Sequence, residues 1–176
     1  MKYGQAGFMF IEVMVAMSII ALVAAATTMS IFQMASTTDR SNGYMTAVRQ
    51  VQNAGYWISQ DAQMAESVST DNLTPPNILV LKWTDWGYDT DSVYHSVTYS
   101  LENVSDGIGE LKRTHQDSEG ANEQMLVAQD IYYDPSDPDN ATQASYEGRV
   151  LTVKLVAMSG GTEEVREYKV YTRPEF

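Results

Sequence analysis

The sequence contains no cysteine, which excludes a disulfide framework, a thiolate metal site and a cysteine nucleophile. It is also poor in positive charge, since 11 Lys and Arg residues stand against 23 Asp and Glu residues and the net charge is −12. A nucleic-acid-binding surface needs Lys and Arg to neutralise phosphates, so we expect no nucleic-acid partner. Anionic lipid headgroups fit such a surface no better.

Catalytic motifs are missing as well. The nucleophile elbow G-x-S-x-G, the zinc motif H-E-x-x-H, the phosphate loop G-x-x-x-x-G-K-[ST] and the dinucleotide loop G-x-G-x-x-G do not occur. His95 and His115 are the only histidines, and neither has a second histidine at ligand spacing in the sequence. We expect each to be a surface or half-packed residue of a strand. The sequence therefore predicts a protein that is not an enzyme.

Charge is missing altogether from Val13 to Thr38, a run of 26 residues. The first 20 of these residues already span a hydrocarbon core of about 30 Å as a helix. The alternative is a secretory signal peptide with an apolar core of roughly 7–15 residues, which the Ala24–Ala26 run would end. Against it, the leader carries only Lys2, and a signal peptide leaves Glu12 unexplained. Because a charge in a spanning helix costs about 2.5–3.5 kcal/mol and usually marks a function, we favour a spanning helix.

Three residues at the start of this segment form a motif: Gly7 is followed by Phe8, and Glu12 is the fifth residue after the glycine. Together with the uncharged helix beyond, this N-terminus resembles that of the type IV pilins and the pseudopilins of type II secretion. The resemblance implies cleavage between Gly7 and Phe8 by a prepilin peptidase and methylation of the new N-terminal Phe8. It also implies that Glu12 meets the N-terminal ammonium of a neighbouring subunit.

That pairing gives a physical reason for an acid in an apolar helix. Glu12 and the ammonium on Phe8 are each unfavourable in lipid, and pairing matters most where the dielectric constant is low. The alternative is that Glu12 snorkels to the headgroups near the cytoplasmic end of the helix. The resemblance further implies a single-pass inner-membrane protein with its headpiece outside the cytoplasm. Its partners would be other pilins or pseudopilins, the prepilin peptidase and an inner-membrane assembly platform.

An apolar stripe at helical spacing continues beyond the membrane segment and predicts an amphipathic helix. Its members are Tyr44, Val48, Val51, Gly55, Ile58, Ala62 and Ala65, and polar residues that include Asp61 surround them. A coiled coil would fit the spacing, but only three heptads are present, so we expect the helix to pack on a sheet. Gly55 and the alanines would let that sheet approach closely. Ser41–Gly43 is a place where the helix is expected to bend or stop.

Short strand-like segments fill the rest of the chain, and several alternate between apolar and polar residues. They are Ile78–Trp83, Val93–Leu101, Glu110–Thr114, Met125–Tyr133, Arg149–Ala157 and Val165–Thr172. Ser159–Thr162 is expected to join the last two as a hairpin. The predicted fold class is α+β, with a long N-terminal helix packed on an antiparallel sheet. The expected divisions are a leader at 1–7, a membrane or filament-core helix at 8–34, an amphipathic helix at 35–66 and a β-rich headpiece at 67–176.

An acidic loop offers a candidate calcium site. Asp134, Asp137, Asp139 and Asn140 gather oxygen atoms of the kind that calcium prefers. The spacing is not that of an EF-hand, and aspartates alternating with prolines also fit a solvated turn. The sequence leaves both interpretations open.

The subtype of the protein is predicted from the layout of the headpiece. Many pilins that build long adhesive fibres carry a C-terminal cysteine pair, which this chain lacks. The layout is most similar to the J-type minor pseudopilins and the related W-type minor pilins, a resemblance that implies a subunit initiating or capping a filament. The alternatives are a membrane-anchored module that binds calcium or another ligand, and a DNA-uptake pilus subunit, which the net charge of −12 disfavours.

Overall fold

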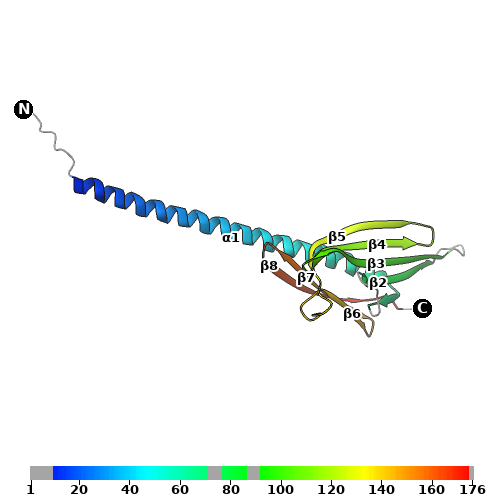
Figure 1. Ribbon diagram of the computed structural model, residues 1–176. Helices are drawn as coiled ribbons and strands as arrows, with labels where there is room; N and C mark the ends of the chain where they lie inside the picture. The colour runs from blue at the N-terminus through cyan, green and yellow to red at the C-terminus, as the bar shows by residue number, and fades with distance from the viewer. Residues whose placement is uncertain (1–9, 71–76, 87–91, 175–176) are drawn as a thin grey trace, which may run out of the picture. The chain divides into compact units, whose positions relative to one another are not determined.

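The computed structural model describes residues 10–70, 77–86 and 92–174, which form one helix and eight strands (Figure 1). Helix α1 runs from Phe10 to Met64 without a break. It therefore continues through Ser41–Gly43, and the predicted interruption of the helix at this place does not occur. The chain divides into two compact units, residues 1–41 and residues 42–176.

In the first unit the described residues, 10–41, all belong to α1, and their side chains are exposed. This is the one helix among the described residues that is long and apolar enough to cross a membrane. Several hydroxyl groups of residues 10–41 bond to the helix itself: Ser18 donates to the carbonyl of Met14 at 2.8 Å, and Thr27 donates to that of Val23 at 2.8 Å. Such internal bonds give each hydroxyl group a hydrogen-bond partner, which a lipid environment cannot supply.

The second unit contains an eight-stranded antiparallel sheet in the order β1-β2-β3-β4-β5-β7-β6, with β8 paired to β7. The predicted α+β fold class is confirmed. The short strands β1 and β6 were not among the predicted strands. The strands are β1 (Ser67–Ser69), β2 (Asn77–Trp86), β3 (Ser92–Ser105), β4 (Ile108–Asp117), β5 (Asn122–Tyr132), β6 (Gln143–Glu147), β7 (Val150–Ser159) and β8 (Thr162–Tyr171).

Tight two-residue turns join three of the strand pairs. Asp106 and Gly107 connect β3 to β4, Gly148 and Arg149 connect β6 to β7, and both residues of each turn have positive φ. Gly160 and Gly161 do the same between β7 and β8, where Ser159 pairs with Thr162. Two positive φ angles define the turn that matches the twist of a hairpin. The predicted hairpin at Ser159–Thr162 is confirmed.

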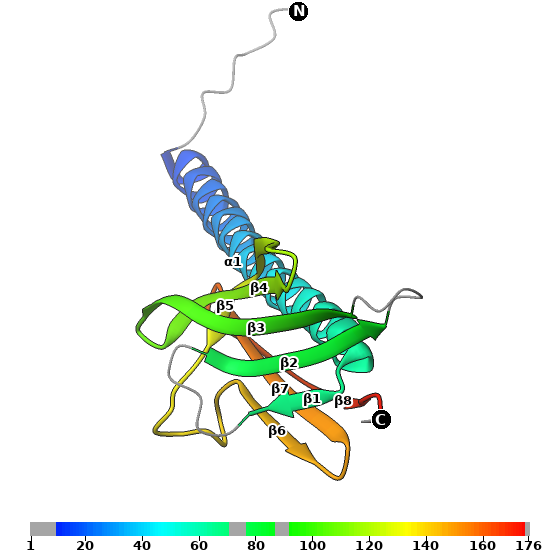
Figure 2. The ribbon, with the colours of Figure 1, turned by 90° about the vertical axis from the view of Figure 1, so that its right-hand side faces the viewer.

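The core of the second unit lies between the sheet and residues 43–64 of α1, and Figure 2 shows the strands curving across this part of the helix. The predicted stripe is correct from Val51 onward. It is wrong at its start, because Tyr44 is exposed and Gly43 and Ala47 are buried instead. The reason is steric: a Cβ atom at Gly43 would lie 2.6 Å from the carbonyl oxygen of Ser159, so only a residue without a side chain fits there.

Gly55 allows a second close approach. A Cβ atom built on it would lie 2.1 Å from Cζ of Tyr168, whose ring covers this part of α1. The Tyr168 hydroxyl donates a hydrogen bond to the backbone carbonyl of Val51 on α1 at 3.1 Å. The prediction that Gly55 lets the sheet approach the helix is confirmed.

Candidate functional site

A buried ion pair connects α1 to the sheet. Asp61 is 1% exposed and accepts two hydrogen bonds from Arg113 of β4, one from Nε at 2.7 Å and one from Nη2 at 2.8 Å. The hydroxyl of Tyr99 on β3 donates a third hydrogen bond to the same carboxylate. The guanidinium of Arg113 also lies over the ring of Trp57, 5.5 Å from its centre. The sequence placed Asp61 among the polar residues around the apolar stripe, and the structure shows that its side chain is buried.

Asp61, Arg113 and Tyr99 form a triad, and their contacts shift the pKa values of Tyr99 and Arg113. Burial raises the pKa of the Tyr99 hydroxyl, and the neighbouring Asp61 carboxylate raises it further. The hydrogen bond to Asp61 raises the pKa of Arg113. The three side chains bind one another inside the core, so the triad has a structural role: it joins the helix to two central strands.

The two histidines of the chain meet on the sheet. His95 on β3 and His115 on β4 are diagonal neighbours, because Val97 is the register partner of His115. Nδ1 of His95 lies 3.1 Å from Nε2 of His115, and the ring planes are inclined by 21°. Trp83 of β2, the register partner of His95, lies nearly parallel to both rings, with its centre 5.2 Å and 5.9 Å from theirs.

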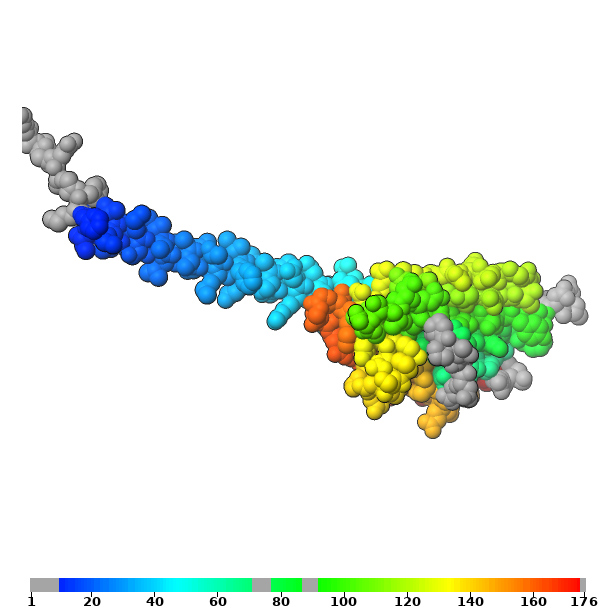
Figure 3. Space-filling model, in the orientation of Figure 1, coloured from blue at the N-terminus to red at the C-terminus, as the bar shows by residue number. Residues whose placement is uncertain are grey.

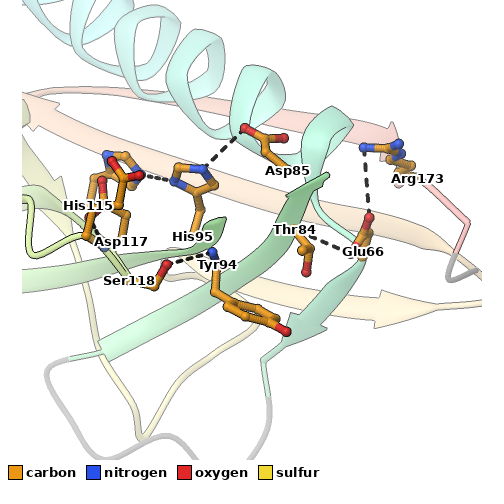
Figure 4. Close-up of polar contacts among 10 residues, drawn as sticks. Glu66, Thr84, Asp85, Tyr94, His95, His115, Asp117, Ser118 and Arg173 are labelled. Carbon is orange, nitrogen blue, oxygen red and sulfur yellow. Dashed lines mark hydrogen bonds and ion pairs between the residues drawn. The ribbon is translucent and has the colours of Figure 1, made fainter. Parts of the chain in front are cut away.

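Two carboxylates complete this cluster (Figure 4). Asp85 Oδ2 is 3.2 Å from Nε2 of His95. Asp117 is the register partner of His95; the backbone N–H of Ala121 lowers its pKa most, and the nearby His95 adds to the effect. Both histidines are half-buried, which confirms that each is a surface or half-packed residue of a strand. The sequence did not indicate that they contact each other. Both histidines lie on the same face of the sheet. Their contact depends on which residues of β3 and β4 are opposite each other, and the sequence of a single strand does not show this register.

An open cleft of about 600 Å³ lies beside this cluster. Its lining includes Glu66, Lys82, Tyr94, Gln116 and Ser118. Glu66 accepts a hydrogen bond from the backbone N–H of Thr84 at 3.2 Å and lies 3.8 Å from Nη1 of Arg173 (Figure 4). These contacts hold the end of α1, β2 and the C-terminal segment together.

Near its N-terminal end, α1 carries one acid on an apolar surface. Glu12 lines a shallow groove of about 310 Å³ with Ile11, Val15, Ala16 and Ile19. Every other residue lining this groove is apolar. Gly7 and Phe8 lie outside the described residues.

Residues 2–28 match the family model of the prokaryotic N-terminal methylation motif. The matched segment contains Gly7, Phe8 and Glu12, and it supports a prepilin-type pilin or pseudopilin. A prepilin-type N-terminus suggests a single-pass membrane anchor, association with other pilins and a structural rather than a catalytic protein. No curated protein and no solved structure matches the chain.

The acidic loop lies on the surface, in the yellow region of Figure 3. Asp134 accepts hydrogen bonds from the hydroxyl of Ser136 at 2.6 Å and from the backbone N–H of Ser136 at 2.8 Å, and these bonds lower the pKa of Asp134. Asp137 accepts one from Nδ2 of Asn140 at 2.9 Å, and the carbonyl of Asp139 accepts one from Lys154. Across residues 10–70, 77–86 and 92–174, no three His, Cys, Asp or Glu side chains form a metal-binding group. The choice between a calcium site and a solvated turn stays open for this loop.

Proposed function

We propose that the chain is a minor pilin or minor pseudopilin that initiates or caps a type IV pilus-like or type II secretion filament. Prepilin peptidase cleaves it between Gly7 and Phe8, and Phe8 becomes the methylated first residue of the mature protein. The observation that carries this proposal is Glu12, a single acid on an otherwise apolar helix surface within a matched methylation motif.

The apolar surface of α1 needs a covering. Its most apolar stretch of 18 residues is not buried by the rest of the chain. Lipid or the helices of other subunits must therefore shield it from water. The hydroxyl groups of this segment already bond to their own helix, as a lipid environment requires. A helix of this kind serves as a membrane anchor before assembly and as part of a filament core afterwards.

Glu12 then gives assembly a defined register. Cleavage creates an ammonium on Phe8, and a charge of either sign is costly within the membrane. When neighbouring subunits are staggered, Glu12 of one neutralises the ammonium of the next in surroundings of low dielectric constant. Two groups that are unfavourable alone thus become a contact that favours assembly.

The headpiece would lie outside the cytoplasm and contact protein partners. Loss of Lys2 with the leader changes the side-chain charge from 11 − 23 = −12 to 10 − 23 = −13, which suits neither DNA nor anionic lipid. The layout of the headpiece, with its many strands and closing hairpin, and the absence of cysteine support a minor subunit of the J-type or W-type layout.

N-terminal mass spectrometry of the protein purified from membranes tests the maturation. The expected first residue is a methylated Phe8, and a strain without prepilin peptidase should retain Met1. An intact Met1 in the presence of the peptidase, or a cut after Ala26, contradicts the proposal.

Substitution of Glu12 tests assembly separately from maturation. Glu12→Ala and the nearly isosteric Glu12→Gln should be inserted and cleaved normally but should fail in assembly, because the ammonium of a neighbour loses its partner. Glu12→Asp keeps the charge with a shorter reach and should be intermediate. Ser18→Ala, a change on the same helix that leaves charge untouched, is the matched control.

The measurements are filament number or secretion in a deletion strain, beside the amount of cleaved protein. For a subunit at the filament tip, the same loss is measured as weaker co-purification with its neighbouring subunits. Normal assembly and normal co-purification in Glu12→Gln would mean that this carboxylate only snorkels to the headgroups.

A further inference from the structure

The two histidines of this chain converge on one point although 20 positions separate them in the sequence. We propose that His95 and His115 bind a divalent transition-metal ion of the class that imidazole ligates, such as Zn²⁺ or Cu²⁺. Nδ1 of His95 and Nε2 of His115 would supply two ligands, and water would fill the remaining positions. This proposal is independent of pilin assembly, since both residues lie on the sheet of the second unit.

The distance between the two nitrogens fits such an ion. Two nitrogens bound at about 2.0–2.1 Å to one tetrahedral zinc ion lie about 3.3 Å apart. In the structure Nδ1 of His95 and Nε2 of His115 are 3.1 Å apart. The spacing therefore suits one ion, although both rings must turn so that their nitrogens face it rather than each other.

Asp85 prepares His95 for this role. Its Oδ2 atom is 3.2 Å from Nε2 of His95, so that nitrogen donates the hydrogen and Nδ1 keeps its lone pair toward His115 (Figure 4). Histidines that bind metals usually have such a carboxylate on their other nitrogen, which fixes the tautomer and makes the ligand more basic. In this arrangement Nε2 of His115 carries the hydrogen between the two rings. When the ion binds, that hydrogen moves to Nδ1 of His115, and the Nε2 lone pair becomes a ligand.

The surroundings favour a cation. Asp117 is the register partner of His95, and Asp85 contacts Nε2 of His95. Two carboxylates therefore flank the two histidines. Arg113, two residues before His115 on the same face of β4, is bound by both oxygens of Asp61. Trp83 lies nearly parallel to both imidazole rings and packs beside them. The ligand pair is thus oriented on a rigid sheet.

Metal titration of the full-length chain in detergent tests the proposal. The chain must carry no polyhistidine tag, and isothermal titration calorimetry with Zn²⁺ should give one equivalent per chain. Copper(II) added instead should show two imidazole nitrogens by electron paramagnetic resonance. This spectrum is decisive without any variant, because the chain has only two histidines and no cysteine. Excess Ca²⁺ should not displace either ion, since calcium prefers oxygen ligands.

Three variants locate the ion. His95→Gln and His115→Gln should each abolish zinc binding, and Asp85→Ala should weaken it by about tenfold through the lost partner of His95. Asp139→Asn, in the acidic loop, is the control and should bind like the parent chain. Circular dichroism shows whether each variant is folded. No saturable zinc binding, a copper spectrum without imidazole nitrogens, or unchanged binding in both histidine variants would overturn the assignment.

Discussion

Asp61 of α1 and Arg113 of β4 form a bidentate and largely buried ion pair, although 52 positions separate them in the sequence. Tyr99 of β3 donates to the same carboxylate, so one acid holds the helix against two strands. A buried pair of this kind is sensitive to the loss of one partner, because the other charge is then left uncompensated in the core. This sensitivity makes the pair a direct test of how the helix and the sheet are joined.

Asp61→Ala should therefore destabilise the headpiece by about 3–5 kcal/mol. For a chain of this size, 1 kcal/mol shifts the Tm by about 2–4 °C. Thermal unfolding of the detergent-solubilised chain, followed by near-UV circular dichroism, measures the shift. Glu167→Ala is the control, because Glu167 pairs with Lys169 at an exposed position and its loss should change stability by no more than about 0.5 kcal/mol. Equal shifts in the two variants would show that the triad does not join helix and sheet.

Gly55→Ala should also lower the Tm, against the usual trend in helices. Alanine normally stabilises a helix by about 1 kcal/mol relative to glycine. Here the new Cβ atom would lie 2.1 Å from Cζ of Tyr168, and overpacking of this kind costs about 1–3 kcal/mol. Adding Gly55→Ala to Tyr168→Ala removes the clash, so in that background the same change should raise the Tm. A higher Tm for Gly55→Ala alone would contradict the close approach of the Tyr168 ring.

Stability should decrease with increasing pH in the alkaline range, and Tyr99 should contribute to the decrease. Burial raises the pKa of Tyr99 in the folded state, whereas an unfolded tyrosine ionises near a pKa of about 10. The stabilisation by the retained proton is complete below about pH 10 and is lost as the pH rises beyond it, by about 1.4 kcal/mol per pH unit. Denaturant unfolding across this range measures the slope.

Tyr99→Phe removes the ionisable group and should make the slope shallower by about one proton. Tyr171→Phe is the matched control, because Tyr171 is 76% exposed. Equal slopes in the parent chain and Tyr99→Phe would show that Tyr99 ionises in the folded state as it does in the unfolded state.

The acidic loop is tested by calcium itself. A ligand that binds only the folded chain raises the Tm, whereas a solvated turn gives no shift. Because Asp134 and Asp137 already accept hydrogen bonds from Ser136 and Asn140, we expect the same Tm in millimolar calcium and in chelator. A rise in calcium that disappears in Asp137→Asn would instead assign the loop as a calcium site.

The sequence by itself determined the features that depend on local pattern. The uncharged run after Glu12, the alternation along β3 and β7, and the glycine pair between β7 and β8 predicted the helix, the strands and the hairpin. These features arise within a few residues of one another, so their periodicity and turn chemistry are visible without the fold. The same holds for the methylation motif, whose residues lie within one short segment.

Only the tertiary structure decided which residues from distant segments meet. The backbone at Ser159 selects Gly43 over Tyr44 as the buried residue of α1, and Arg113 draws Asp61 into the core. The contact between His95 and His115 depends on the register of β3 against β4. Register follows from how a whole sheet packs, and a shift by one residue would turn every side chain to the other face. For this reason neither the buried acid nor the paired histidines could be found from the pattern of their own strands and helix.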